Sequence, residues 1–199
     1  MTDAAAAAPA EPRRFESRHS GRFHGAELAY RCLAAETLLP DEAGKPRASV
    51  FSFSYLAETD DPAARPVTFM FNGGPGSASL WLHMGVFGPR RIVVPGDASH
   101  PGGGPYQVVD NEFCNLDRTD IVFIDPPGTG YSRMAEGVAP EEAWGLEADA
   151  QIVADFIKAW LSAHRRWASP RYLCGESYGT TRAVAVAGKL SGGLQGDRK

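Results

Sequence analysis

Cysteine, basic clusters and long apolar runs are all scarce in this sequence. The three cysteines, Cys32, Cys114 and Cys174, are odd in number and far apart. They therefore predict neither a disulfide framework nor a metal site, and we expect reduced, mostly buried thiols. No run of Lys or Arg exceeds two residues and the formal net charge is −4, which argues against nucleic-acid binding. No stretch approaches the roughly 18 apolar residues of a membrane span, so we expect no membrane partner, and nothing indicates a cofactor.

The N-terminus also lacks the pattern of a signal peptide. Its five-alanine run, Ala4–Ala8, is surrounded by prolines and charges instead of following a basic start. We expect residues 1–18 to form a disordered tail and the protein to be cytoplasmic, or periplasmic or secreted if the true start lies upstream. Residues 19–199 are expected to form one partial domain, because 43% hydrophobic and 22% charged residues are typical of a globular chain.

Apolar patterns predict a sheet that begins with an antiparallel pair and continues with buried strands. Residues 26–38 and 48–57 are β-like and separated by a turn-rich segment. Short apolar runs at 67–71 and 121–124 end in Gly or Pro and are typical of central strands. One amphipathic helix is predicted at about 140–167. The alternation of strands and helices indicates an α/β fold with a mostly parallel sheet.

Charged residues of the predicted helix are expected on its surface. Asp149, Asp155 and Lys158 lie off the apolar stripe. Arg165 and Arg166 lie at the C-terminal end, where positive charge complements the helix dipole.

A five-residue motif nominates a nucleophile. It follows a short strand-like run and opens a helix-like stretch, as a nucleophile elbow requires. Its residues are Gly175, Glu176, Ser177, Tyr178 and Gly179. A serine on a sharp strand-to-helix turn needs small neighbours two positions away, so Ser177 is the candidate attacking residue. Alone, in a chain with 22 glycines, the match is weak, and a glycine-flanked turn is the alternative.

Two further glycine-bearing segments are predicted at the same carboxyl edge of the sheet. Residues 71–77 read Phe-Asn-Gly-Gly-Pro-Gly-Ser, and residues 125–132 run from Asp125 to Ser132. In order and spacing, the three segments resemble the serine carboxypeptidase family, with most likeness to bacterial members, over roughly residues 20 to 190. The resemblance implies an α/β-hydrolase fold.

The resemblance also implies the parts of an acyl-transfer site. Ser177 would be the acylated nucleophile, and the backbone N–H groups of Gly74 and Tyr178 would form the oxyanion hole. One such donor contributes about 2.7 to 4 kcal/mol to stabilising the transition state.

A second set of residues would recognise the end of a peptide. By the same resemblance, Asn72, the Gly73 amide and Glu176 would hold the terminal carboxylate of a peptide substrate. Two carboxyl groups in contact are not cheaply ionised together, so Glu176 would share a proton with the substrate. Activity favoured by acidic pH is the expected consequence.

Other polar residues near these segments have structural explanations. The Asp125 segment is interpreted mainly as a wall of the cleft, and Asp125 is not nominated as a triad acid because it precedes Ser177, whereas the family order is serine, acid, histidine. All five histidines also precede Ser177. Only His83 is expected near the cleft, and none is expected to be the triad base.

The sequence departs from the family pattern at several points. Ser77 stands where eukaryotic members have a cysteine, and Val86 where many have a second glutamate, so carboxylate recognition is expected to be weaker or differently built. A complete member would continue beyond the elbow helix with further strands, the triad acid and the histidine. We therefore expect the N-terminal half of a serine carboxypeptidase. The alternatives are an inactive truncated fragment and an esterase or acyltransferase on the same fold.

Overall fold

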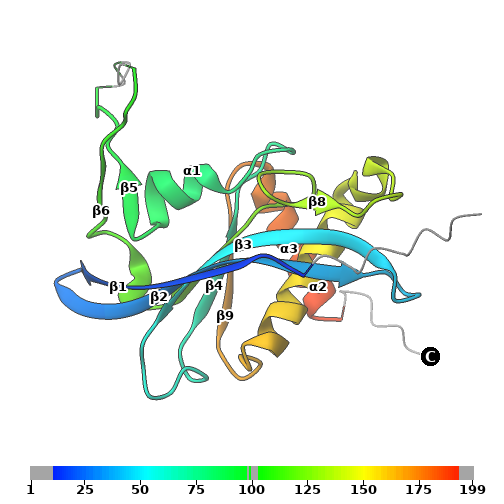
Figure 1. Cartoon of the computed structure of the whole chain (residues 1–199), viewed down its shortest axis with the longest axis horizontal. Helices are drawn as coiled ribbons and strands as arrows, with labels where there is room; N and C mark the ends of the chain where they lie inside the picture. Colours follow the sequence, from blue (N-terminus) through cyan, green and yellow to red (C-terminus); the bar gives the residue numbers. More distant parts are fainter. Residues whose placement is uncertain (1–10, 98, 100–102, 193–199) are drawn as a thin grey trace, which may run out of the picture.

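The computed structural model describes residues 11–97, 99 and 103–192. In this part of the chain, a seven-stranded mixed sheet lies between two helices on one face and shorter elements on the other (Figure 1). The strands of this sheet are β1 (Arg14–Phe23), β2 (Ala26–Pro40), β3 (Pro46–Ala57), β4 (Val67–Phe71), β7 (Asp120–Ile124), β8 (Arg133–Met134) and β9 (Arg171–Gly175). The other elements are α1 (Leu80–Leu82), η1 (His83–Phe87), β5 (Arg90–Ile92), β6 (Val108–Asp110), η2 (Asn115–Asp117), η3 (Pro140–Ala143), α2 (Leu146–Ala163) and α3 (Tyr178–Leu190).

The first three strands of the sheet are antiparallel. β1 pairs with β2 and β2 with β3, and β3 then pairs antiparallel with β7. The predicted antiparallel pair is confirmed, and both strands are longer than their apolar patterns indicated.

The parallel part of the sheet positions the candidate site. Across the sheet the order is β1-β2-β3-β7-β4-β9, and β4 is parallel to both of its neighbours. After β4 the chain therefore passes first to one side of that strand and then to the other. Ligands of open α/β sheets bind beyond the carboxyl ends of the strands at such a switch point. Both the segment after β4 and the candidate elbow after β9 lie there.

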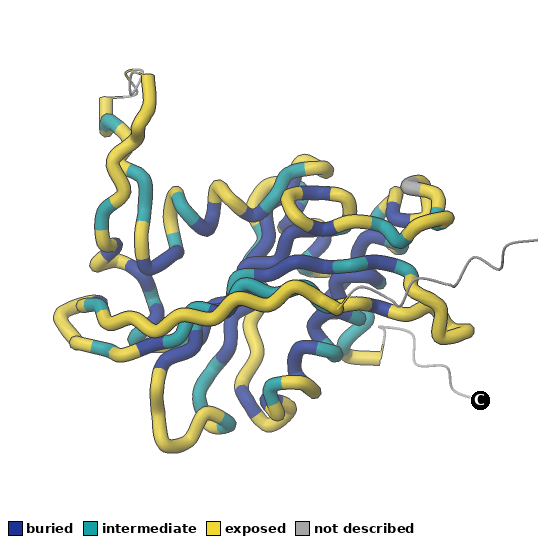
Figure 2. Tube along the Cα trace, in the orientation of Figure 1, coloured by how far each residue is buried: buried dark blue, intermediate teal, exposed yellow. Residues whose placement is uncertain are grey.

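Alternate side chains of the central strands enter two different cores. Val67, Phe69 and Phe71 of β4 face α2 and α3, whereas Met70 faces the opposite side with Leu82. β4 and β7 are buried along their whole length, as Figure 2 shows for the middle of the sheet. The prediction of two central strands is confirmed.

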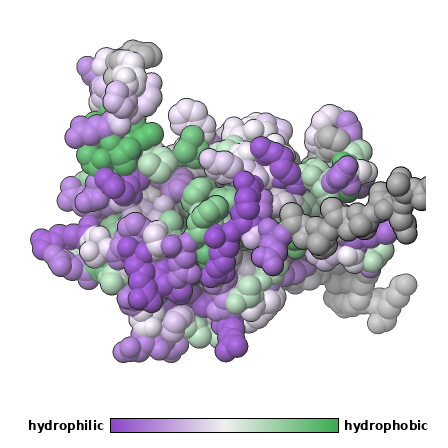
Figure 3. All heavy atoms as spheres, in the orientation of Figure 1, coloured by the Kyte–Doolittle hydropathy of each residue, from purple (hydrophilic) through white to green (hydrophobic). Residues whose placement is uncertain are grey.

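An excursion hairpin follows η1. β5 and β6 pair antiparallel, and the hairpin extends away from the sheet (Figure 1). Hydrophobic surface gathers at this hairpin (Figure 3), where Val93, Val94 and Val108 are exposed. His100, in the Pro/Gly-rich stretch between these two strands, lies outside the described residues.

The N-terminal prediction needs correction. Residues 14–18 are part of β1, which pairs with β2 from Arg14 opposite Ala35 onward. The expected tail was therefore too long: nearly every side chain of β1 is exposed, so the strand carries little apolar pattern. Residues 1–10 of the expected tail lie outside the described residues.

The long helix is shorter than predicted, and two charged residues of the predicted segment are buried. η3 precedes it, Gly145 separates the two with a φ of 85°, and α2 ends at Ala163. Asp149 is buried against Arg182, and Arg166 is buried against Asp120. The surface prediction is therefore wrong for Asp149, and Arg166 is held by an ion pair within the protein. Among the described helices, none combines the length and apolarity needed to cross a membrane.

Candidate active site

Ser177 occupies a strained turn between β9 and α3. Its φ of 57° and ψ of −124° lie outside the regions that non-glycine residues commonly adopt. Gly175 and Gly179 permit the tight crossing around it, because a Cβ on Gly175 would lie 2.0 Å from the Gly179 carbonyl oxygen. A Cβ on Gly179 would lie 2.8 Å from the Phe71 carbonyl oxygen. The geometry is that of a serine raised on a sharp strand-to-helix turn.

The segment after β4 lies directly against this turn. A Cβ on Gly73 would be 2.5 Å from the Tyr178 amide nitrogen and 2.6 Å from the Glu176 carbonyl oxygen. Gly74 has a φ of 101°, which a side chain would oppose. Tyr178 is the first residue of α3, where an amide has no intrahelical acceptor. The structure thus packs Gly73 against the Tyr178 amide, and Gly74 lines the same cavity as Ser177.

Asn72 and Glu176 are joined beside Ser177. Asn72 Nδ2 donates to Glu176 Oε2 at 3.1 Å, and the Leu82 amide donates to Asn72 Oδ1 at 3.0 Å. Asn72 is buried, whereas Glu176 and Ser177 are exposed. Both Asn72 and Glu176 line a cavity of about 400 Å³ that also includes Ser177. Two of the three predicted carboxylate-binding residues, Asn72 and Glu176, therefore share one cavity with the predicted nucleophile; Gly73 lies between the lining residues Asn72 and Gly74 but does not itself line the cavity.

One departure from the family pattern lies in the wall of this cavity. Trp81 and Val86 line it, and they are 71% and 51% exposed. Val86 presents an apolar side chain where many family members would present a second glutamate. Among the residues that line this cavity, Glu176 is the acid.

Asp125 braces the neighbouring loop. It accepts hydrogen bonds from the backbone N–H groups of Ser79 and Tyr131, each at 3.0 Å. Gly130 is required here, since a Cβ would lie 2.0 Å from Asp125 Oδ2. Burial raises the pKa of Asp125 above its usual range. These contacts support the interpretation of residues 125–132 as a wall of the cleft.

The described histidines make their contacts away from Ser177. His19 is hydrogen-bonded to Ser17, His24 to Asp117 and His83 to Tyr55, while His164 stacks on Trp160 with ring centroids 4.3 Å apart. Burial lowers the pKa of His164 to about 4, so it is neutral at pH 7. In the described part of the chain, no histidine contacts Ser177, and no cluster of His, Cys, Asp and Glu is arranged to hold a metal.

The buried His83 is expected to make the folded state less stable at acidic pH. Its ring stacks on Phe123 and meets Phe53 at a tilt. Its Nε2 is 2.6 Å from the Tyr55 hydroxyl, and burial lowers its pKa to about 4. An unfolded histidine has a pKa of about 6.5, so the unfolded state binds a proton first as the pH falls. Stability should therefore decline from about pH 6.5 towards pH 4, with His164 contributing in the same direction. Chemical denaturation across this range measures the decline, and His83→Gln should make it shallower; an unchanged slope in this variant would contradict the assignment.

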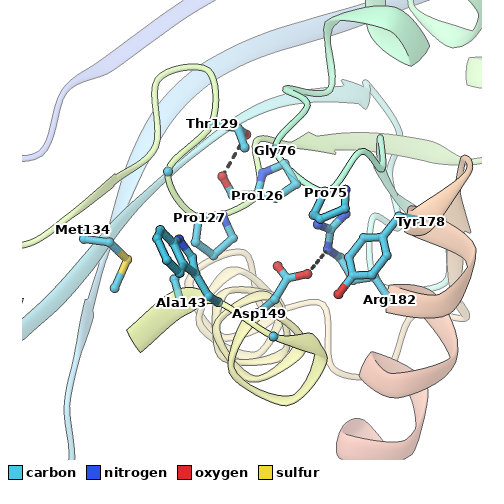
Figure 4. A pocket seen from close by; sticks show the side chains of 13 residues that line it. Pro75, Gly76, Pro126, Pro127, Thr129, Met134, Ala143, Asp149, Tyr178 and Arg182 are labelled. Carbon is cyan, nitrogen blue, oxygen red and sulfur yellow. Dashed lines mark hydrogen bonds and ion pairs between the residues drawn. The ribbon is translucent and has the colours of Figure 1, made fainter. Parts of the chain in front are cut away.

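An ion pair beneath the site was missed by the sequence analysis. Arg182 Nε of α3 donates to Asp149 Oδ2 of α2 at 2.7 Å, and both side chains are buried. The pair lies in a second cavity of about 480 Å³ beside Pro75 and Tyr178 (Figure 4). Burial raises the pKa of Asp149, and Arg182 opposes that shift. The only sequence signal was an arginine within a helix of small and apolar residues.

A strained serine between a parallel strand and a helix, with a glycine-rich segment packed against it, defines an α/β hydrolase. The sheet order, with β4 between β7 and β9, supplies the matching scaffold.

The chain belongs to the serine carboxypeptidase family, because the sequence model of that family matches residues 43–193. It is 30% identical over 145 residues to pheromone-processing carboxypeptidase KEX1 of Puccinia graminis f. sp. tritici, covering 70% of this chain and 20% of that protein. It is 29% identical over 145 residues to serine-type carboxypeptidase F of Aspergillus niger, covering 71% of this chain and 24% of that protein. A third relative is P-(S)-hydroxymandelonitrile lyase of Sorghum bicolor, which is 28% identical over 123 residues. The match covers 61% of this chain and 22% of that protein. The matched segments thus span about a quarter or less of these relatives.

Proposed function

We propose that the protein carrying these residues is a serine-type carboxypeptidase, which removes C-terminal residues from peptides through an acyl-enzyme on Ser177. The observation that carries this proposal is the Asn72–Glu176 pair, which shares a cavity with Ser177. A buried amide joined to an exposed carboxyl group suits a ligand that ends in a carboxylate. Two of the relatives are named as carboxypeptidases, which supports the same reading.

The proposed chemistry assigns each group a role. Ser177 Oγ attacks the last peptide carbonyl, and the Gly74 and Tyr178 N–H groups stabilise the oxyanion that forms. A general base takes the Ser177 hydroxyl proton and passes it to the leaving nitrogen as the C–N bond breaks and the C-terminal amino acid departs. Water, deprotonated by the same base, then attacks the acyl group, and the released Ser177 oxygen recovers a proton. The attack requires a general base, and none of the described histidines contacts Ser177. The proposed reaction therefore needs a base other than the described histidines in their present positions.

The cellular location forms part of this proposal. Cys32, Cys114 and Cys174 are free, and burial raises the pKa of Cys114 to about 12. Inert thiols of this kind, together with Ser77 in place of a cysteine, favour the reducing cytoplasm.

Hydrolysis of matched peptides tests the function. An N-blocked dipeptide with a free C-terminal carboxylate should be cleaved much faster than its C-terminal amide, and a fluorophosphonate should label Ser177. If a simple ester were cleaved as fast as the free-acid dipeptide, and the free acid were cleaved no faster than its amide, the result would instead support an esterase or acyltransferase. Absence of both labelling and cleavage would support an inactive fold.

Glu176→Gln should remove the preference for acidic pH. The wild-type carboxyl group must share a proton with the substrate carboxylate, whereas a glutamine amide donates a hydrogen bond at any pH. We expect kcat/KM of the variant to vary less between pH 5 and 8, with about a tenfold loss at the acidic end. The measurement is kcat/KM against pH for the free-acid dipeptide.

Glu147→Gln is the matched control for this experiment. Glu147 is an exposed acid on α2 and pairs with Lys189, so its replacement should leave the profile of activity against pH unchanged. A Glu176→Gln profile that coincides with the wild-type profile would exclude Glu176 from carboxylate binding.

A further inference from the structure

We propose that Arg182, held by Asp149, fixes the peptide plane between Asn72 and Gly73 and thereby directs the Gly73 N–H to the substrate carboxylate. Arg182 is in this view a positioning residue. The inference rests on the carboxypeptidase function proposed above, because it concerns how that site recognises the end of a peptide.

Arg182 contacts both the segment that follows β4 and the start of α3. Its Nη1 donates to the Asn72 carbonyl oxygen at 2.6 Å, and its Nε donates to Asp149 Oδ2 at 2.7 Å. Its guanidinium carbon lies 5.1 Å from the centre of the Tyr178 ring and 5.6 Å from that of Phe71. Figure 4 shows the Arg182 side chain between Asp149 and Tyr178. With 1% of its surface exposed, Arg182 has little freedom to leave these partners.

The geometry of the peptide unit then fixes the direction of the Gly73 N–H. The Asn72 C=O and the Gly73 N–H belong to one planar trans peptide unit and point in opposite directions. Arg182 binds the carbonyl from the cavity beneath the site, so the N–H is turned away from Arg182. Asn72 and Glu176 line the other cavity, which contains Ser177 and does not include Arg182. Within the described residues, the Gly73 N–H has no hydrogen-bond acceptor of its own.

The charge of Arg182 also makes the Gly73 N–H a stronger hydrogen-bond donor. A hydrogen bond from a charged donor to a peptide carbonyl is stronger than a neutral one and polarises the peptide unit. The Gly73 N–H, at the other end of that unit, becomes a better donor to an anion. Asp149 holds the guanidinium in place and balances its charge in the interior.

Binding to a non-hydrolysing protein tests this role without relying on catalysis. The natural protein with Ser177→Ala is titrated by calorimetry with an N-blocked dipeptide as the free acid and, separately, as its C-terminal amide. The free acid should bind more tightly in this background. Adding Arg182→Met should weaken binding of the free acid about tenfold while binding of the amide changes little, so that the selectivity is lost. In the protein with Ser177 intact, the loss should appear in KM for the free acid.

Two further variants separate positioning from stability. Arg182→Met leaves the buried Asp149 unpaired, whereas the double variant Arg182→Met with Asp149→Leu replaces the ion pair by an apolar pair and should recover thermal stability. Selectivity for the free acid should remain lost in the double variant. Lys189→Met is the control, because Lys189 bonds to Glu147 at 2.8 Å and also joins α3 to α2 without contacting Asn72. It should leave selectivity unchanged.

The possible results are distinct. Recovery of selectivity together with stability in the double variant would overturn the proposal and leave Arg182 a structural role. Equal binding of acid and amide by the Ser177→Ala protein would overturn both this inference and the carboxypeptidase function. Selective binding that depends on Arg182, in a protein that cleaves neither peptide when Ser177 is present, would refute the proposed catalysis and retain the positioning role.

Discussion

Replacing Ser177 with alanine is expected to lower kcat for peptide hydrolysis by about 10⁴- to 10⁶-fold, the range seen when a member of a catalytic unit is removed. The alanine has no atom that can attack the peptide carbonyl or carry the acyl group. The oxyanion donors of Gly74 and Tyr178 remain, so some acceleration over the uncatalysed reaction should persist. Steady-state hydrolysis of the free-acid dipeptide and loss of fluorophosphonate labelling measure the effect.

The fold should tolerate this change, which makes the result interpretable. Ser177 is exposed, and alanine would have the same strained φ of 57°, so thermal stability should change little. Ser191→Ala is the matched control, because Ser191 is an exposed serine that follows the same helix. Its activity and labelling should equal those of the wild type. If Ser177→Ala retained most of the activity, the nucleophile would have to be another residue.

The candidate nucleophile could be predicted because its constraints are local in the sequence. The strain at Ser177 requires glycine at two nearby positions, and the close approach of Gly73 to the Tyr178 amide requires another. Such requirements leave a motif that can be recognised without knowing the rest of the fold. The central strands were equally clear, since burial on both faces leaves short continuous apolar runs.

The buried ion pairs could not be predicted, because the two residues of each pair lie far apart in the sequence. Asp149 and Arg182 are 33 residues apart, and Asp120 and Arg166 are 46 apart. A charged residue within a helical pattern is expected to face solvent unless a partner on another element is known to pair with it. The same limit applied to β1, where exposed side chains concealed a strand that backbone hydrogen bonds to β2 hold in place.

Asp120→Asn is expected to lower the free energy of unfolding by about 3–5 kcal/mol, the usual effect of breaking a buried ion pair by removing one partner. Asp120 is 1% exposed and begins β7. Its Oδ1 accepts from Arg65 Nε at 2.8 Å, and its Oδ2 accepts from Arg166 Nη1 at 2.6 Å. Asparagine keeps the shape but leaves the buried Arg166 without a counter-charge. Urea denaturation of the variant and the wild type measures the difference.

A surface acid provides the control for this prediction. Asp155 lies on α2 about a third exposed and pairs with Lys158 at 3.2 Å, so Asp155→Asn should change stability by less than about 1 kcal/mol. A similarly small effect of Asp120→Asn would show that Arg65 and Arg166 are satisfied by their remaining partners. Asp120 begins β7, at the end of the sheet opposite Ser177, so the folded variant should bind the free-acid dipeptide with unchanged selectivity. Loss of stability with retained selectivity, set against the reverse result expected for the Arg182 double variant, would separate the residues that hold the fold from those that direct the site.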